Sequence, residues 1–284
     1  NIFSVKEALE IMDVFAKKKD IYFLSSSKPE CSRRWYWCSF RSKIPHYNKS
    51  TPTPAAFASR FVHVLMSLDE MGAQYYLFAD NDTMLRSMYH FNYFISLLCG
   101  IFDALAIETR ERFSIEFEGD HIPSRTSLNK KSGDKFLSAL KKKNIELWGH
   151  YSKYRDFIEL IYTMRQSVVH REGLAKAGSE HRTRKGERWQ ANIIDLSKDI
   201  ETMKQIQKMG TVPKPFQPMS EWGIYNRTSA LSPYDFAKAA TKKLIEFSNT
   251  YLRLMGFPNY LVILDSDHDL LNDIKTLETE GLGF

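Results

Sequence analysis

The sequence predicts a mainly α-helical (all-α) protein, an antiparallel helical bundle with an N-terminal helical extension and a basic insertion before its last helix. Three observations predict this class. Apolar residues recur every three or four positions along most of the 284 residues, several of these segments begin with helix caps, and their connections are short. The chain is 43% hydrophobic and 26% charged, so it has enough apolar material for a core and is neither collagen-like nor wholly disordered.

Residues 1–79 form the expected helical extension, packed on the bundle. Ser4 and Glu7 make a capping box, in which each side chain satisfies a free backbone N–H of the other residue. An apolar stripe at helical spacing then continues to about Lys18. Residues 20–51 are rich in aromatic side chains and fit either short strands or a packed irregular segment.

Two long helices are expected next. Thr53 followed by Pro54 is a favoured helix start, which predicts a helix from Pro54 to about Ala79. Residues 80–82 break this helix and cap another over about Thr83–Phe113. The second helix carries an apolar surface wide enough to be buried on more than one side, as in the central helix of a bundle.

The middle of the chain predicts a loop and two further helices. Glu116–Ser132 contains glycine, proline and many polar residues, which are typical of a loop. Gly133–Lys143 is expected to form a short helix, and Ile145–Glu172 a long one. Gly173 closes the long helix, because glycine readily adopts the left-handed conformation that ends helices.

A polar and basic segment, Leu174–Leu231, separates these helices from the last one. We interpret it as a partly mobile insertion with at most one good helix, at about Ile193–Lys208. Ser232 and Pro233 then start a helix that ends at Gly256. The expected domains are therefore the extension 1–79, a bundle over 80–256 that includes the insertion 174–231, and a C-terminal tail over 257–284.

Composition and residue spacing bear on the cellular compartment, on metal or cofactor binding and on membrane association. The three cysteines, Cys31, Cys38 and Cys99, include no CxxC pair, which excludes a disulfide scaffold and favours a reducing cytoplasm. The spacing of Cys31, Cys38 and His46 fits no common zinc pattern, so no metal and no cofactor are expected. Tyr93–Ile107 is the most apolar stretch and is shorter than the ~20 residues of a membrane span, so no membrane association is expected.

One motif carries specific chemistry. The patterns of dinucleotide-binding, Walker A, zinc-protease and serine-hydrolase sites are absent, whereas Arg165 and His170 close the helix predicted over Ile145–Glu172. This motif resembles that of the HEPN superfamily, compact helical bundles whose nucleases carry arginine, four to six residues and then histidine near a helix end. The residue after the arginine is typically polar in that family, often asparagine, aspartate or histidine, and Gln166 is polar but is none of these three. A second match, Arg41–His46, contains Pro45 and lacks helical periodicity, so we interpret it as coincidence.

The resemblance covers roughly residues 83–256 and implies a function. It implies a metal-independent endoribonuclease that leaves a 2′,3′-cyclic phosphate and a 5′-hydroxyl, in prokaryotic defence, a toxin–antitoxin system or a stress response. RNA supplies its own nucleophile, the 2′-hydroxyl. His170 would move protons, because histidine titrates near neutral pH. Arg165 would stabilise the phosphorane through its planar donors, with Gln166 in support.

The spacing of the motif also predicts a homodimer. Five positions on an α-helix correspond to about 140° around its axis, so Arg165 and His170 do not share one helix face. Two chains related by a two-fold axis could place both pairs in one cleft. HEPN nucleases, which this chain resembles, build one composite site per dimer. A regulatory or antitoxin protein is a further possible partner implied by the resemblance.

Other basic residues are candidates for RNA binding. A moderate net charge of +6 is compatible with an anionic partner. The expected backbone contacts follow the motif and lie mostly in the insertion; they are Arg171, Lys176, Arg182, Arg184, Lys185 and Arg188, with Trp189 available for stacking. Lys141–Lys143 are interpreted as cations favoured at a helix C-terminus.

Two alternatives to the nuclease remain open. The chain could be a catalytically inactive HEPN-like module that binds nucleic acid or protein. It could also be a structural helical protein, in which His170 only caps a helix and Arg165 pairs with Asp156 or Glu159.

Overall fold

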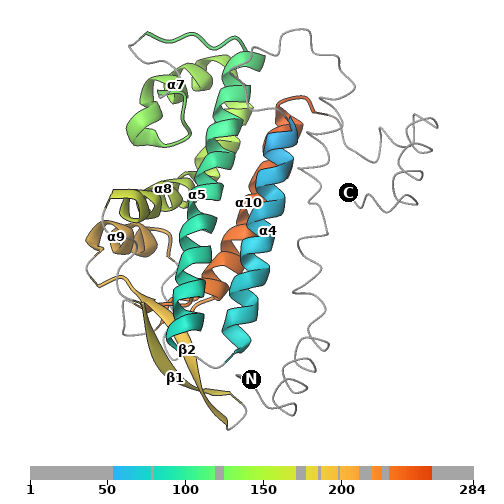
Figure 1. Cartoon of the computed structure of the whole chain (residues 1–284). Helices are drawn as coiled ribbons and strands as arrows, with labels where there is room; N and C mark the ends of the chain where they lie inside the picture. The colour runs from blue at the N-terminus through green and yellow to red at the C-terminus, as the bar shows by residue number, and fades with distance from the viewer. Residues whose placement is uncertain are drawn as a thin grey trace, which may run out of the picture. The chain divides into compact units, whose positions relative to one another are not determined.

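The structure is a computed structural model that describes eight stretches of the chain (Figure 1). They are residues 54–77, 80–118, 125–170, 177–184, 187–197, 199–210, 219–225 and 230–257. Helix accounts for 77% of this described part, which confirms the mainly α-helical class. The elements in chain order are α4 (Pro54–Tyr76), α5 (Asn81–Arg112), α7 (Lys130–Lys143), α8 (Ile145–His170), β1 (Ala177–Arg184), β2 (Glu187–Asp195), α9 (Ile200–Lys208), β3 (Ala230–Leu231) and α10 (Pro233–Leu254).

The long helices form where caps and apolar periodicity predict them. α4 begins at Pro54, and α10 begins at Pro233 with Ser232 Oγ accepting from the backbone N–H of Asp235 (3.4 Å). The break before α5 is an Asx-type cap, since Oδ1 of Asp80 accepts from the backbone N–H of Thr83 (2.8 Å). The expectations for residues 1–53, for Gly173 and for the tail beyond Phe257 lie outside the described residues. The predicted domain boundaries stay predictions.

The predicted insertion contains regular structure that the sequence interpretation did not anticipate. β1 and β2 pair as an antiparallel hairpin, and β3 adds two residues to the edge formed by β2. Ile193, expected to start a helix, lies in β2, and α9 begins only at Ile200. The boundary falls there because Asp199 caps α9, its Oδ1 accepting from the backbone N–H of Thr202 (3.1 Å).

The chain divides into two compact units, each with its own core. Within the described residues, the first unit comprises 63–96 and 163–241, and the second comprises 54–62, 97–162 and 242–257. Each of the four long helices therefore contributes residues to both units.

Aromatic side chains form the core of the first unit. The ring of Phe236 in α10 contacts Phe91 of α5 and Trp222, with centroids 5.7 and 5.9 Å apart respectively. Gly223 makes the turn beneath this cluster with φ of +73°, and a Cβ there would lie 2.9 Å from the backbone nitrogen of Phe236. Glycine is required at this position for both reasons.

The second unit packs around Phe102 of α5. Its ring makes edge-to-face contacts with Phe157 of α8 and Phe247 of α10, at 5.9 and 5.8 Å between centroids. Contacts further along, between Thr109 and Tyr251, follow the same order, so α5 and α10 run in the same direction. Because α7, α8 and α9 lie between α5 and α10 in the chain, these two helices can pack in parallel. This pair therefore differs from the antiparallel neighbours that the sequence predicts.

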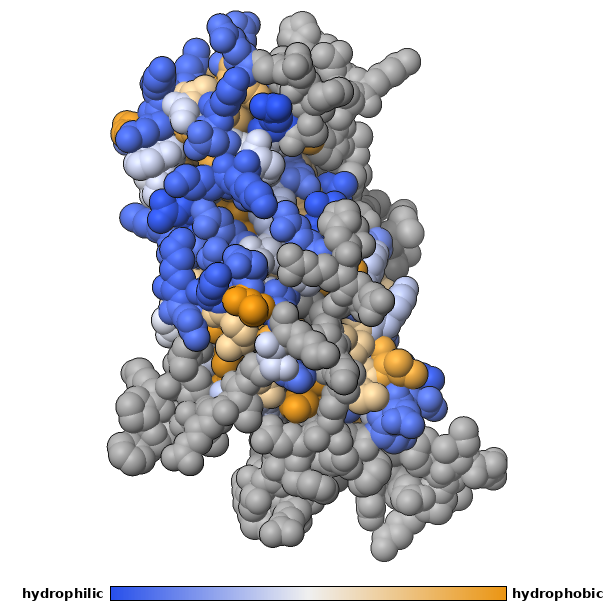
Figure 2. Space-filling model, turned by 90° about the vertical axis from the view of Figure 1, so that its left-hand side faces the viewer, coloured by the Kyte–Doolittle hydropathy of each residue, from blue (hydrophilic) through white to orange (hydrophobic). Residues whose placement is uncertain are grey.

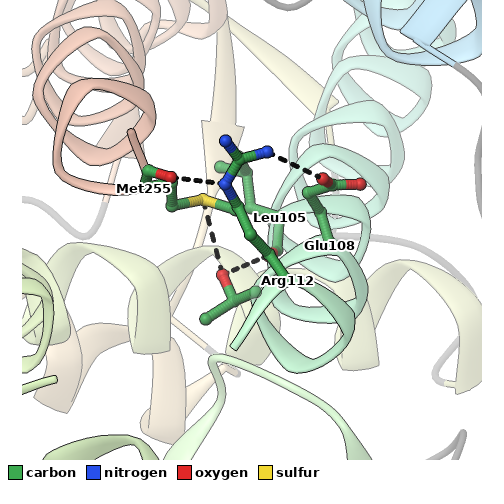
Figure 3. A network of polar contacts seen from close by, with 5 residues as sticks. Leu105, Glu108, Arg112 and Met255 are labelled. Carbon is green, nitrogen blue, oxygen red and sulfur yellow. Dashed lines mark hydrogen bonds and ion pairs between the residues drawn. The ribbon is translucent and has the colours of Figure 1, made fainter. Parts of the chain in front are cut away.

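A polar clasp joins the ends of α5 and α10 in the second unit (Figure 3). Arg112 donates from Nε to the backbone carbonyl of Met255 (2.5 Å), and its guanidinium lies 4.2 Å from the centre of the Phe257 ring. Its Nη1 lies 4.0 Å from Oε1 of Glu108. The Thr109 hydroxyl donates to the carbonyl of Leu105. The clasp satisfies a terminal carbonyl that α10 leaves without a helical partner.

Helix α5 is long and apolar enough to cross a membrane when judged by length and composition alone. Of its most apolar 18-residue window, 61% is buried within the protein. The central helix of a bundle has the same property, so this criterion gives only weak evidence for a membrane span.

Candidate functional site

The last turns of α8 present the predicted motif on a helix with one buried and one exposed face. Leu160, Ile161 and Met164 are buried, whereas Arg165 and Gln166 are exposed. Arg165 lies four residues after the buried Ile161, so its exposure shows that the buried apolar stripe of α8 ends before the last turn. The exposed guanidinium is the feature that the predicted chemistry requires at this position.

A buried hydrogen-bond network anchors this end of α8 to α9. Ser167 donates from Oγ to Oδ2 of Asp199 (2.5 Å), and the Thr202 hydroxyl donates to the same oxygen (2.7 Å). Asp199 is 6% exposed and also caps α9 through its other oxygen. A buried carboxylate is tolerated only when donors surround it, so this network fixes the backbone directly beneath Arg165.

Arg165 makes no ion pair with any residue in the described part of the chain. The two carboxylates considered as its partners, those of Asp156 and Glu159, lie 3.6 and 3.9 Å from Nε of Arg155. Arg155, ten residues earlier in α8, thus pairs with the carboxylates that the structural alternative assigned to Arg165.

His170 is the last residue of α8, so the helix is continuous across the motif. Its side chain lies outside the described part of the structure. The unbroken helix keeps the Cα positions of Arg165 and His170 about 140° apart around the axis, as expected for five helical steps. One chain therefore places the two residues on different helix faces.

The predicted RNA-binding residues are divided between the hairpin and undescribed positions. Arg171, Lys176 and Lys185 lie outside the described residues. Arg182 and Arg184 are in β1, where their Cα partners in β2 are Trp189 and Glu187. Arg188 in β2 is paired with Thr183. The hairpin brings these positions into one two-stranded element, and the side chains of its arginines are not described.

No metal centre is found among the residues that the structure places. In that part of the chain, no group of three histidine, cysteine, aspartate or glutamate side chains is arranged to hold an ion. Cys99 is buried and its thiol donates to the carbonyl of Ile161 (3.7 Å). Cys31, Cys38, His46 and the second motif match Arg41–His46 lie outside the described residues.

The sequence interpretation missed two features that shape this region. The hairpin has a local sequence signal. Only Lys185 and Gly186 separate the paired residues Arg184 and Glu187, and two residues that include glycine are typical of a hairpin turn. The Ser167–Asp199 hydrogen bond joins residues 32 positions apart, so the local sequence does not predict it. The local sequence indicates only that Asp199 can cap the helix that follows it.

Comparison with known proteins identifies no relative of this chain: a scan against protein-family models, a search of curated proteins and a search of solved structures each return no match. The class of the protein therefore rests on its own structure. It is a mainly α-helical protein with an exposed arginine near the end of a helix that is anchored by a buried hydrogen bond.

Proposed function

We propose that this chain is a cytoplasmic, metal-independent endoribonuclease of the HEPN type, with Arg165 and His170 as its catalytic pair. One observation carries the proposal: Arg165 is exposed and makes no ion pair in the described part of the chain, while the backbone beneath it is fixed by the Ser167–Asp199 bond. An exposed arginine on an anchored helix is suited to an anionic ligand. The order of long helices, with α8 before the hairpin and α10 after it, also supports the resemblance.

The proposed chemistry divides the work between two residue types. The imidazole of His170 takes the proton of the 2′-hydroxyl or gives one to the leaving 5′-oxygen. The bond from the 2′-oxygen to phosphorus forms while the bond to the 5′-oxygen breaks, which yields a 2′,3′-cyclic phosphate and a 5′-hydroxyl. The guanidinium of Arg165 stabilises the negative charge that accumulates on the phosphorane oxygens.

The proposed active species is a homodimer. Because α8 is helical up to His170, Arg165 and His170 of one chain diverge by about 140°. A two-fold axis near the ends of the two α8 helices would bring the arginine of each chain toward the histidine of the other. Gln166, exposed beside Arg165, is placed to support substrate or the facing helix.

The test is cleavage of total RNA in EDTA by the wild-type protein and by Arg165→Ala and His170→Ala variants. We expect metal-independent cleavage by the wild type, products ending in a cyclic phosphate, and loss of cleavage in both variants. Lys238→Ala is the matched control, since Lys238 is an exposed cation of α10 in the same unit as Arg165. Cleavage that survives both motif substitutions would contradict the proposal.

A second candidate function, a catalytically inactive binding module, is favoured by a different surface. Leu85, Tyr89 and Tyr93 recur every four residues on α5 and are 62%, 68% and 41% exposed, and Met66 of α4 is 49% exposed. Tyr93 Oη lies 3.4 Å from His63 Nδ1 of α4, so the two helices are neighbours here, and exposed apolar side chains on neighbouring helices are typical of protein interfaces. Under this candidate, RNA or a regulatory protein such as an antitoxin would bind without cleavage, and Arg165→Ala would leave that binding unchanged.

A further inference from the structure

Helix α7 carries an unusual concentration of positive charge. Its 14 residues contain six lysines and one aspartate, a net charge of +5, whereas the whole chain has a net charge of +6. The positive character of this protein is therefore concentrated in one short helix. Helix α7 and the start of α8 both belong to the second unit.

None of these lysines is buried. Gly133, Phe136, Leu137 and Leu140 are buried and hold the helix against its unit. A Cβ at Gly133 would lie 1.9 Å from the carbonyl oxygen of Ser127, so the close packing of α7 at this position requires glycine. The lysines are all exposed; they are Lys130, Lys131, Lys135, Lys141, Lys142 and Lys143. Figure 2 shows a largely hydrophilic surface in its upper part, on the side of the molecule where α7 lies.

Helix stability explains only part of this pattern. Lys141–Lys143 stand in the last turn, where cations interact favourably with the helix dipole. Lys130 and Lys131 stand in the first turn, where the dipole disfavours cations, and no acidic residue accompanies them there. The first-turn lysines thus oppose the local electrostatics of the helix, which points to a role outside it.

Four of the six lysines are available to a partner. Lys135 donates to the carbonyl of Glu118 (3.1 Å), and the Nζ of Lys141 lies 4.5 Å from the ring centre of Trp148. The side chains of the other four make no ion pair or hydrogen bond to any described residue. These four, Lys130, Lys131, Lys142 and Lys143, define what we call the α7 basic face.

We infer that the α7 basic face binds the phosphate backbone of single-stranded RNA, and this inference rests on the proposed nuclease function. The four lysines stand in pairs at the two ends of α7, which has 14 residues and a kink at Gly133, so the face offers two separated points of contact to successive phosphates. Trp148, partly exposed beside Lys141, provides an aromatic surface near the charges. A lipid surface fits less well, because the apolar face of α7 that would enter a membrane is already buried in the protein.

The test is the affinity of full-length protein for a fluorescein-labelled 2′-O-methyl oligouridylate of about 20 nucleotides. This probe cannot be cleaved, so the result does not depend on the catalytic pair. The variant Lys130→Gln, Lys131→Gln, Lys142→Gln, Lys143→Gln is compared with the wild type. Its matched control replaces four exposed lysines of the first unit or of α10, Lys204, Lys208, Lys238 and Lys242, by glutamine.

We expect the α7 variant to bind at least about tenfold more weakly at ~100 mM salt, with the slope of log affinity against log salt reduced by about 2 to 3. The control should change affinity by less than about threefold, and both variants should keep the helical circular dichroism and melting temperature of the wild type. Equal losses in the two variants would overturn the inference, because net charge would then explain them. So would unchanged RNA binding accompanied by lost binding to phosphatidylserine vesicles. Absence of RNA cleavage by the wild type would count against the proposed function alone.

Discussion

Two arginines at the ends of long helices have opposite surroundings. Arg112, in the last turn of α5, is bonded to the Met255 carbonyl, stacked on Phe257 and paired with Glu108. Arg165, near the end of α8, is exposed and has no ion pair in the described stretches. The protein surrounds one guanidinium with partners and leaves the other toward solvent.

This difference separates a structural arginine from a candidate functional one. Arg112 satisfies the carbonyl left by the end of α10, so its contacts account for its position without any ligand. Arg165 contributes nothing comparable to its own unit, although the helix that carries it is firmly anchored by Ser167. Stability should therefore depend on Arg112, and activity on Arg165.

The largest effect on stability is expected from removing the anchor beneath Arg165. Asp199→Ala leaves the hydroxyls of Ser167 and Thr202 without their acceptor and removes the cap of α9, which should cost about 3 kcal/mol in unfolding free energy. Chemical denaturation measures the change. Glu201→Ala is the control, because Glu201 is exposed in the first turn of the same helix and pairs only with Lys204 among its described neighbours. Equal stability of the two variants would show that the anchor is not important.

Arg112→Ala should have the next largest effect. Loss of the carbonyl bond and the ring contact should lower the unfolding free energy by about 2 kcal/mol, while RNA cleavage per folded molecule stays unchanged. Arg86→Ala, which removes an exposed arginine of the same helix, should stay within about 0.5 kcal/mol of the wild type. A reduced cleavage rate in folded Arg112→Ala protein would remove the distinction between the two arginines.

A smaller and pH-dependent effect is expected at His150 in the core of the second unit. Its Nε2 lies 3.0 Å from the carbonyl of Phe247, and its ring stacks on the Phe247 ring with centroids 5.3 Å apart. Burial lowers the pKa of His150, and the nearby cations Lys153 and Arg253 lower it further, against the hydrogen bond to Phe247. The unfolded chain therefore binds the proton more tightly, and stability should fall as pH drops below about 6.5.

Denaturation of the wild type and a His150→Gln variant between pH 8 and pH 5 measures this dependence. The variant should lose less stability over that range than the wild type does. Parallel pH profiles of the two proteins would show that His150 is not the group responsible.

The smallest effect is expected at Glu108, the acidic member of the clasp. Burial raises the pKa of Glu108 despite the attraction of Arg112, with Glu111 adding to the rise. A raised folded-state pKa means that this group favours the folded state at low pH and that the benefit is lost as pH rises through that pKa. Glu108→Gln should therefore be as stable as the wild type or up to about 1 kcal/mol more stable at pH 8, with no gain at pH 4. A clear loss at pH 8 would show that the ion pair outweighs burial.

Local signals predicted the long helices, and long-range contacts explain most of what they missed. α4 and α10 begin at the prolines that their caps indicated, and α8 runs through the motif as its periodicity required. The hairpin was missed because β1 has no apolar alternation, since polar residues dominate both of its faces. β1 is a strand because all of its residues pair with β2, and this pairing is not visible in the sequence of β1 alone.

The candidate site was predictable in its residues but not in its support. Arg165 was identified by its spacing from His170, whereas its exposure was not predictable, because it lies at helical spacing from the buried Ile158 and Ile161. Its anchor was not predictable, because the Ser167–Asp199 bond depends on how α9 is placed against α8. The basic character of α7 was underestimated for a simpler reason, since the helix begins at Lys130 rather than Gly133 and so includes two additional lysines.

The most direct test measures two quantities, RNA cleavage in EDTA and unfolding free energy, on the same preparations of Arg165→Ala and Arg112→Ala protein. The expected result is a crossed pattern. Arg165→Ala loses cleavage by at least about a hundredfold with its stability within ~0.5 kcal/mol of the wild type, and Arg112→Ala does the reverse. Full cleavage by Arg165→Ala, or a loss of its stability that matches its loss of cleavage, would contradict the assignment of Arg165 to the active site.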